Sequence, residues 1–248
     1  MKRLCAALRF LTILPVPARW AGDETDLNRG VPFFPVVGLL IGLLIASFDL
    51  ALSRAFPPLL ASTFVVVALI AVSGGLHLDG LADSADGLFS SRPREQVLEI
   101  MRDSRVGPMG VAAIVCTISL KIAAVSSIGS GTRWAAILLM PLAGRCALVI
   151  LMELLPYARR EGGLATVFQE NRSMLHTVWA VGALTFVGWI SAGSTGLAVA
   201  VVSITATLLL AAYMYSKIGG FTGDTLGAAC EIVEVLPALV LAASSNAV

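Results

Sequence analysis

The sequence predicts an all-α fold: a polytopic integral membrane bundle of six to seven transmembrane helices, forming one domain over residues 1–248. Hydrophobic residues make up 57% of the chain and charged residues only 13%, where a soluble domain carries about 25% charged residues. Several apolar runs reach the roughly 20 residues that a helix needs to cross a bilayer. No segment shows the alternating ten-residue pattern of a membrane β-barrel. The apolar side chains must therefore face lipid.

Residues 1–30 are expected to form an N-terminal amphipathic segment at the membrane surface. The stretch MKRLCAALRFLTILPVPARW begins with basic residues, and Arg9 interrupts its apolar run. It lacks an A-x-A-like cleavage site, so an uncleaved interfacial segment is favoured over a signal peptide.

Six apolar runs are predicted to cross the membrane, and a seventh is too short to cross it comfortably. The six cover residues 31–53, 58–76, 107–128, 134–155, 175–193 and 196–216. The seventh, 235–248, is expected to be a partial or re-entrant helix. Most prolines lie near the ends of these runs, where a missing N–H is easiest to tolerate.

The distribution of lysine and arginine predicts the orientation. The polar segments at the N-terminus, at 77–106, at 156–174 and from Lys217 hold thirteen cations, while the intervening loops hold Arg54 and Arg133. Because positive residues stay on the cytoplasmic side, the N-terminus and all these polar segments are expected to face the cytoplasm. The net charge of +1 gives no reason to expect nucleic acid as a partner.

The segment 73–107 gathers carboxylates in an otherwise apolar chain. Asp79, Asp83 and Asp86 follow an i, i+4, i+7 spacing, which places them on one face of a helix. Such like charges repel, and each would cost about 2.5–3.5 kcal/mol at the bilayer centre. A divalent cation such as Mg²⁺, Mn²⁺ or Ca²⁺ relieves this repulsion. We favour a metal site over the alternative of a solvated helix face in an ordinary loop.

Glycines in the same segment also favour a ligand-binding site. They stand at positions 74, 75, 80 and 87. Glycine weakens a helix, so its repeated use favours a site that a ligand must approach closely.

An amphipathic helix is predicted next, in RPREQVLEIMRDSRVG. Pro93 marks its start, and Val97, Ile100 and Met101 form its apolar face. We expect this helix to lie at the membrane surface.

The end of that helix, RDSR, presents Arg102, Asp103, Ser104 and Arg105. Arginine side chains match phosphate oxygens in pairs, so a phosphate-binding role is one interpretation. Anchoring at the membrane surface is the other, and the spacing does not decide between them.

A second acidic segment, residues 217–234, repeats the theme in KIGGFTGDTLGAACEIVE. Asp224 follows a glycine-rich turn, and Glu231 and Glu234 follow within three helical turns. Such a turn can cradle a phosphate or help hold a metal ion. The two acidic segments are therefore predicted to form two halves of one metal–phosphate site.

Three further residues are candidates. Arg145 lies inside an apolar run and is a functional candidate by default, whereas Lys121 either snorkels or pairs with a nearby acid. His77 is either a neighbour of a metal ligand or a simple interfacial histidine. The residues alone thus indicate a membrane enzyme that uses a divalent metal to transfer a phosphoryl or phosphodiester group.

Four motifs resemble one known family. They are FLTILPVP (10–17), GGLHLDGLADSADGL, IMRDSRVGPMG and GGFTGDTLGAACEIVE, in that order along the chain. This set is similar to that of cobalamin synthase, also called adenosylcobinamide-GDP ribazoletransferase or cobalamin-5'-phosphate synthase. The resemblance covers residues 8 to 234, and a set of four ordered motifs is specific.

The resemblance implies the last assembly step of the nucleotide loop of vitamin B12. Adenosylcobinamide-GDP would donate its cobinamide phosphate to α-ribazole or α-ribazole 5'-phosphate, and GMP would leave. Family members are Mg²⁺-dependent proteins of the bacterial or archaeal inner membrane, which makes the lipid bilayer and other late enzymes of the pathway expected partners.

The same resemblance implies roles for individual residues. Asp79, Asp83 and Asp86 are expected to be catalytic and, with Asp224, to hold Mg²⁺. Further metal ligands and the residues that bind substrate or phosphate complete the expected site: Asp103 and Glu231 for the metal, and His77, Arg102, Ser104, Arg105 and Arg145 for the substrate.

Three other classes of protein fit the sequence less well. A CDP-alcohol phosphotransferase opens on D-x-x-D-G, which Asp83, Asp86 and Gly87 match, but the Ala-Arg that follows is missing because Arg92 comes late. An ion-coupled transporter places its acids at the membrane midplane, often within repeated halves, and no repeat is visible here. A non-catalytic scaffold would leave the carboxylates unexplained.

Overall fold

The computed structural model describes residues 1–20, 22, 24–159 and 172–245. Over these residues the chain is helical, with a single isolated bridge between Tyr157 and Phe221 in place of any strand. The elements are α1 (Lys2–Leu11), η1 (Ala18–Trp20), α2 (Glu24–Asn28), η2 (Val31–Phe33), α3 (Phe34–Ala55), α4 (Pro58–Val72), α5 (Leu76–Leu88), α6 (Arg94–Ile100), α7 (Pro108–Ser126), α8 (Ser130–Leu154), α9 (Met174–Ile218) and α10 (Gly223–Ser245).

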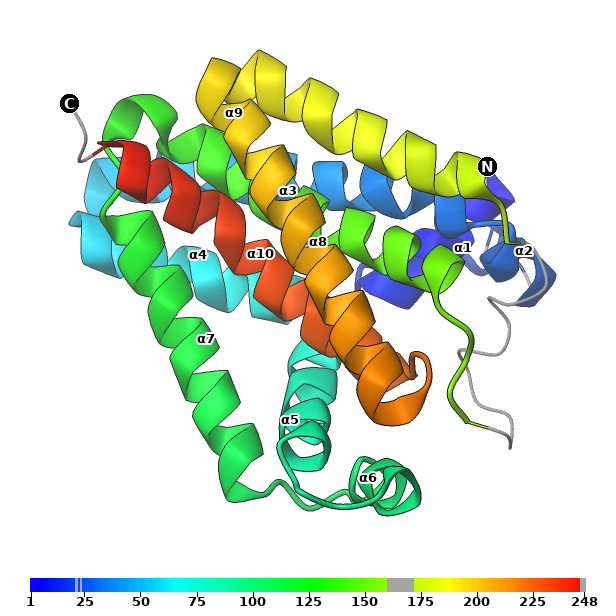
Figure 1. Ribbon diagram of the computed structural model, residues 1–248. Helices are drawn as coiled ribbons and strands as arrows, with labels where there is room; N and C mark the ends of the chain where they lie inside the picture. Colours follow the sequence, from blue (N-terminus) through cyan, green and yellow to red (C-terminus); the bar gives the residue numbers. More distant parts are fainter. Residues whose placement is uncertain (21, 23, 160–171, 246–248) are drawn as a thin grey trace.

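The helices form the expected all-α membrane bundle (Figure 1). Five helical segments are long and apolar enough to cross a membrane, and α4 with α5 makes a sixth if that bent pair is counted. The five are Val31–Ala55, α7, α8, α9 and α10. The chain is a multi-pass membrane protein.

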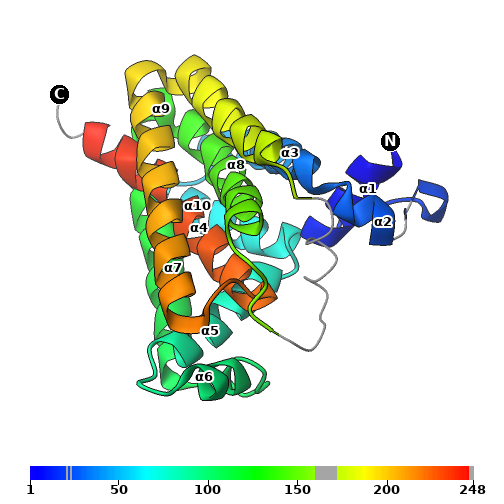
Figure 2. The ribbon, with the colours of Figure 1, turned by 45° about the vertical axis from the view of Figure 1, so that its right-hand side comes forward.

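Helix α8 is the core of the bundle. It is buried along its length and packs against α3, α9 and α10 (Figures 1 and 2). Small residues let the neighbouring helices approach it closely: a Cβ on Gly42 of α3 would stand 2.4 Å from the carbonyl oxygen of Leu138. Close backbone approach of this kind drives helix association in a bilayer.

Two predicted spans appear inside α9. Ala192 and Gly193 have non-helical backbone angles, and they divide α9 into two arms that correspond to the predicted runs 175–193 and 196–216. The arms separate sharply at this point in Figure 1. Gly188 and Gly196 pack backbone to backbone, since a Cβ on Gly196 would lie 1.8 Å from the Gly188 carbonyl oxygen.

The predicted span 58–76 is broken. Helix α4 ends at Val72, and Gly74 and Gly75 take positive φ values of +62° and +75°. The following helix, α5, is bent 89° away from α4. Its 13 residues reach only about 20 Å at 1.5 Å per residue, short of the roughly 30 Å hydrocarbon core. We therefore treat α5, which carries the three aspartates, as lying outside the membrane spans.

The prediction of a separate short helix over 235–248 was wrong. Helix α10 runs without a break from Gly223 to Ser245, with Pro237 inside it. Residues 223–234, predicted as part of a polar segment, are instead the first half of a helix long enough to cross the membrane. The glycine-rich turn before Asp224 was predicted to run into a helix, and α10 does begin at Gly223.

Candidate active site

Helices α5 and α10 cross at glycines, and this crossing sets the geometry of the site. A Cβ on Gly80 would lie 2.7 Å from the carbonyl oxygen of Asp224 and 3.2 Å from the Cα of Gly227. Because these glycines have no side chains, α5 and α10 can approach closely. Asp79 and Asp83 of α5 therefore lie beside Asp224 at the start of α10. The glycines of this segment were predicted to admit a ligand. At Gly80 they admit a neighbouring helix instead.

Four carboxylates share one electrostatic environment at this crossing. Burial, and then the neighbouring charges of Asp79, Asp224 and Asp86 in that order, raise the pKa of Asp83 to about 6. Like charges at short range disfavour the ionised form. The two acidic segments of the sequence therefore do meet, through Asp224.

Asp86 has a structural role that the sequence did not reveal. Its Oδ2 accepts a hydrogen bond from the Gly107 amide at 2.6 Å, and its Oδ1 accepts one from the Gly110 amide at 2.9 Å. These amides begin α7, so Asp86 caps that helix from a distance and interacts favourably with its dipole. Its spacing from Asp83 had suggested only metal binding.

Asp224 is held by a cation that was not among the predicted site residues. Arg159 donates from Nη2 to Asp224 Oδ2 at 2.7 Å, and Thr222 Oγ1 donates to the same oxygen at 3.3 Å. Thr222 also caps α10 reciprocally with Thr225: each backbone amide donates to the other's hydroxyl, at 2.8 Å and 3.2 Å.

Two backbone hydrogen bonds place Arg159 opposite Asp224. The Ala158 amide donates to the Phe221 carbonyl at 2.8 Å, and the Phe221 amide donates to the Pro156 carbonyl at 2.9 Å. Only this long-range pairing makes Arg159 distinguishable from the other arginines of its polar segment. Residues 160–171 of that segment lie outside the described residues.

A basic hollow adjoins the carboxylates. It has a volume of about 360 Å³, and its charged lining consists of three arginines and two glutamates, Arg94, Arg102, Arg159, Glu95 and Glu99. Arg94 is anchored, since its Nε donates to the Ile218 carbonyl at 2.7 Å and its Nη2 to the Ala158 carbonyl at 2.5 Å. Helix α6 packs its apolar residues Val97 and Met101 on the protein itself, so this part of the amphipathic face is covered by protein.

Of the RDSR stretch, the structure brings only Arg102 to this hollow. Arg105 instead forms an ion pair with Asp103 at 2.6 Å, with 88% of the Arg105 side chain exposed. This hydrogen bonding lowers the pKa of Asp103 to about 2. Ser104 is also exposed. Asp103, Ser104 and Arg105 are not among the residues that line the hollow, which corrects their expected place in the site.

Glu231 and Arg145, expected at the metal–phosphate site, lie in the bundle interior. Lys121 Nζ donates to Glu231 Oε2 at 2.7 Å and to Glu234 Oε1 at 2.8 Å, and Arg145 donates to Glu234 Oε2. Because α10 is a continuous helix, Glu231 lies about 10 Å along its axis from Asp224. The expected metal role of Glu231 and phosphate role of Arg145 are therefore corrected to a buried ion-pair cluster. Of the two alternatives for Lys121, pairing with an acid is the one found.

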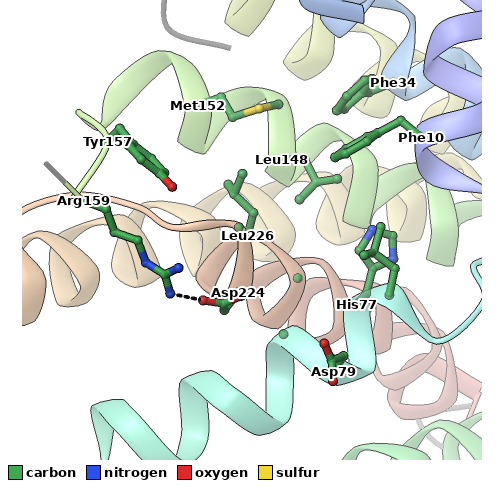
Figure 3. Close-up of a pocket in the computed structure, with 14 residues that line it drawn as sticks. Phe10, Phe34, His77, Asp79, Leu148, Met152, Tyr157, Arg159, Asp224 and Leu226 are labelled. Carbon is green, nitrogen blue, oxygen red and sulfur yellow. Dashed lines mark hydrogen bonds and ion pairs between the residues drawn. The ribbon is translucent and has the colours of Figure 1, made fainter. Parts of the chain in front are cut away.

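A cavity of about 250 Å³ opens at the carboxylates (Figure 3). Asp79, Asp224 and Arg159 line its polar end. The remaining wall comes from α1, α3, α5, α8, α10 and the segment after α8, and it consists of Phe10, Phe34, Leu76, His77, Gly80, Leu148, Met152, Tyr157, Gly223, Leu226 and Gly227. His77 is only 3% exposed. Burial, and then the charge of Arg145, lowers its pKa to about 3, so its imidazole is neutral.

The carboxylates suit Mg²⁺ when phosphate oxygens complete the coordination. Within the described residues, no group of three or more His, Cys, Asp or Glu is close enough to hold a metal ion alone. Mg²⁺, however, commonly binds through one or two carboxylates, substrate phosphates and waters. The side-chain carboxylates of Asp79 and Asp83 accept no hydrogen bond from another described residue. The carboxylate of Asp224 accepts hydrogen bonds only through Oδ2. Hard oxygen donors are therefore available beside the cavity.

Comparisons with known proteins give a consistent result. A family model described as cobalamin-5-phosphate synthase matches residues 3–242. Three similar proteins are each named adenosylcobinamide-GDP ribazoletransferase. The protein from Acetivibrio thermocellus is 40% identical over 233 residues, 94% of each chain. That from Herpetosiphon aurantiacus is 41% identical over 99% of this chain and 98% of its own. That from Citrobacter koseri is 40% identical over 97% and 99%. No solved structure matches the chain significantly.

Proposed function

Because the chain belongs to the cobalamin-5-phosphate synthase family, we propose that its cavity and carboxylates join adenosylcobinamide-GDP to α-ribazole or its 5'-phosphate, with release of GMP. The family makes the chain a transferase of cobalamin synthesis, and it favours this function over a CDP-alcohol phosphotransferase or a transporter. One observation carries the proposal. Carboxylates from α5 and α10 meet beside a basic hollow, and this combination suits a metal-bound diphosphate.

Asp79 and Asp224, which line the cavity, are the residues that would hold Mg²⁺. When bound there, Mg²⁺ would supply positive charge that offsets the negative charge developing on the departing GMP. Arg159 and Arg102 lie on the neighbouring wall and would bind the remaining phosphate oxygens.

The transfer replaces one phosphorus–oxygen bond by another. The ribose 3'-oxygen attacks the phosphorus that carries cobinamide, and the bond from that phosphorus to the GMP oxygen breaks. The 3'-hydroxyl proton must move to a base. Asp83 lies one helical turn from Asp79, and its pKa of about 6 suits proton acceptance near neutral pH. Both bond electrons leave with GMP, which departs as a phosphate monoester.

The orientation is part of the proposal. Figure 1 shows α1 and α2 at the right of the bundle and α5 and α6 at its lower end, both away from the break in α9 and the C-terminus at the upper left. This grouping supports a bacterial inner-membrane protein with its N-terminus and active site in the cytoplasm, where nucleotide substrates are found.

A single reconstitution tests the function. Purified protein in lipid nanodiscs is supplied with adenosylcobinamide-GDP, α-ribazole 5'-phosphate and Mg²⁺, and GMP is measured by chromatography. We expect GMP and cobalamin 5'-phosphate in equal amounts, with the free nucleoside tested in parallel. If neither acceptor gives GMP although the protein is folded, the proposal is overturned.

A further inference from the structure

The cavity has an apolar end for which the phosphate chemistry has no use. Phe10 and Phe34 stack there with ring centroids 5.9 Å apart and planes inclined by 21°. Leu148 and Met152 of α8 and Leu226 of α10 complete the wall. In Figure 3, Phe10, Phe34, Leu148 and Met152 lie away from Asp79 and Asp224, whereas Leu226 lies next to Asp224. A diphosphate would gain nothing from aromatic and aliphatic neighbours, so this end must receive another part of a substrate.

His77 also lines the cavity. Its Nδ1 has no hydrogen-bond partner among the described residues, but this atom is buried and exposes almost no surface to the cavity. The His77 ring therefore lines the cavity through its other atoms.

The size of the cavity restricts what it can bind. About 250 Å³ is slightly less than the roughly 300–1,000 Å³ of complete small-molecule sites. The space therefore holds one fused ring system. It cannot hold a corrin macrocycle, which must stay outside.

We propose that the apolar end of this cavity binds the benzimidazole base of the ribazole substrate. With the base beside Phe10 and Met152, the attached ribose extends toward Asp79 and Asp224. The order base, ribose, phosphorus thus follows the cavity from its apolar to its polar end. This proposal rests on the transferase function proposed above.

Filling the cavity tests its occupant. Met152→Trp places an indole in the space where the base would lie, and Leu154→Trp, on the same helix but 38% exposed and outside the cavity, is the matched control. We expect Met152→Trp to raise the KM for the ribazole acceptor about tenfold or more, since stacking and fit at such a site are worth this factor. The KM for adenosylcobinamide-GDP should change less than about twofold. Equal changes for both substrates, or no change for ribazole, would overturn the proposal.

Binding of the base alone separates this proposal from the proposed function. 5,6-Dimethylbenzimidazole is titrated into wild-type and Met152→Trp protein in nanodiscs, without Mg²⁺ or corrinoid, and binding is followed by calorimetry. Saturable binding that Met152→Trp removes supports the cavity even if the transfer assay fails. If the protein is active but Met152→Trp changes neither the binding of the free base nor the KM for ribazole, the cavity proposal is refuted and the transferase function stands.

Discussion

Replacing Asp83 by asparagine should separate catalysis from folding. The change removes the proposed proton acceptor while keeping its size. General-base catalysis contributes about 10²–10⁴-fold, so kcat should fall by that factor, or about 3–5 kcal/mol in activation free energy. The folded protein should lose no stability. Asp83 is repelled by Asp79 and Asp224, and a neutral side chain relieves that repulsion.

The assay is GMP release at saturating Mg²⁺, together with thermal unfolding of the same nanodisc sample. Ser84→Ala is the matched control on α5, because the Ser84 hydroxyl is buried without a hydrogen-bond partner in the described structure and its removal should alter neither measurement. An Asp83→Asn protein with full activity would refute the assignment of the base. A protein that unfolds at a much lower temperature would refute the electrostatic argument.

The other predictions concern the same helices. Wild-type kcat/KM should fall about tenfold per pH unit below about 6, the pKa of Asp83, because protonation removes the base. A flat rate profile down to pH 5 would contradict this role. The free energy of unfolding should instead rise as pH falls from about 6 toward 3.8, because a raised carboxyl pKa favours the folded state in that range. Gly80→Val should destabilise the protein by about 1–3 kcal/mol and reduce activity, because its Cβ would meet the Asp224 carbonyl oxygen at 2.7 Å; normal thermal unfolding would show that α5 and α10 do not pack as described. Lys121→Met should cost about 3–5 kcal/mol by leaving Glu231 buried without an ion-pair partner and Glu234 with Arg145 alone, and adding Glu231→Gln should recover part of the loss in the same unfolding measurement.

Composition and periodicity predicted the membrane bundle well, because apolar runs of the right length have one physical solution in lipid. The break in α9 and the start of α7 also followed from the pattern of the sequence. The 89° turn after α4 could not be predicted from that pattern. Gly74 and Gly75 were visible, but a glycine pair does not reveal whether a ligand or a change of chain direction requires it.

The sequence predicted that the carboxylates lie close together, but it did not predict the positions of Arg159 and Glu231. Helical spacing predicted the grouping of Asp79 and Asp83, and a shared membrane face predicted the approach of Asp224. Arg159 escaped notice because its position depends on a backbone pairing with Phe221, 62 residues away by sequence number. Glu231 was misplaced because the sequence does not show that a polar stretch continues into the bilayer as one straight helix.

Helix α10 joins the site to the buried ion pairs, and this has a consequence for precision. Sliding α10 by a single residue along α7 would separate Glu231 and Glu234 from Lys121 and leave buried charges without partners in hydrocarbon. An apolar helix of the same length has no comparable barrier to such a slip. The buried ion pairs thus fix the position of α10 along its own axis. They thereby determine, from within the bilayer, where Asp224 lies relative to Asp79 and Arg159 at the cavity.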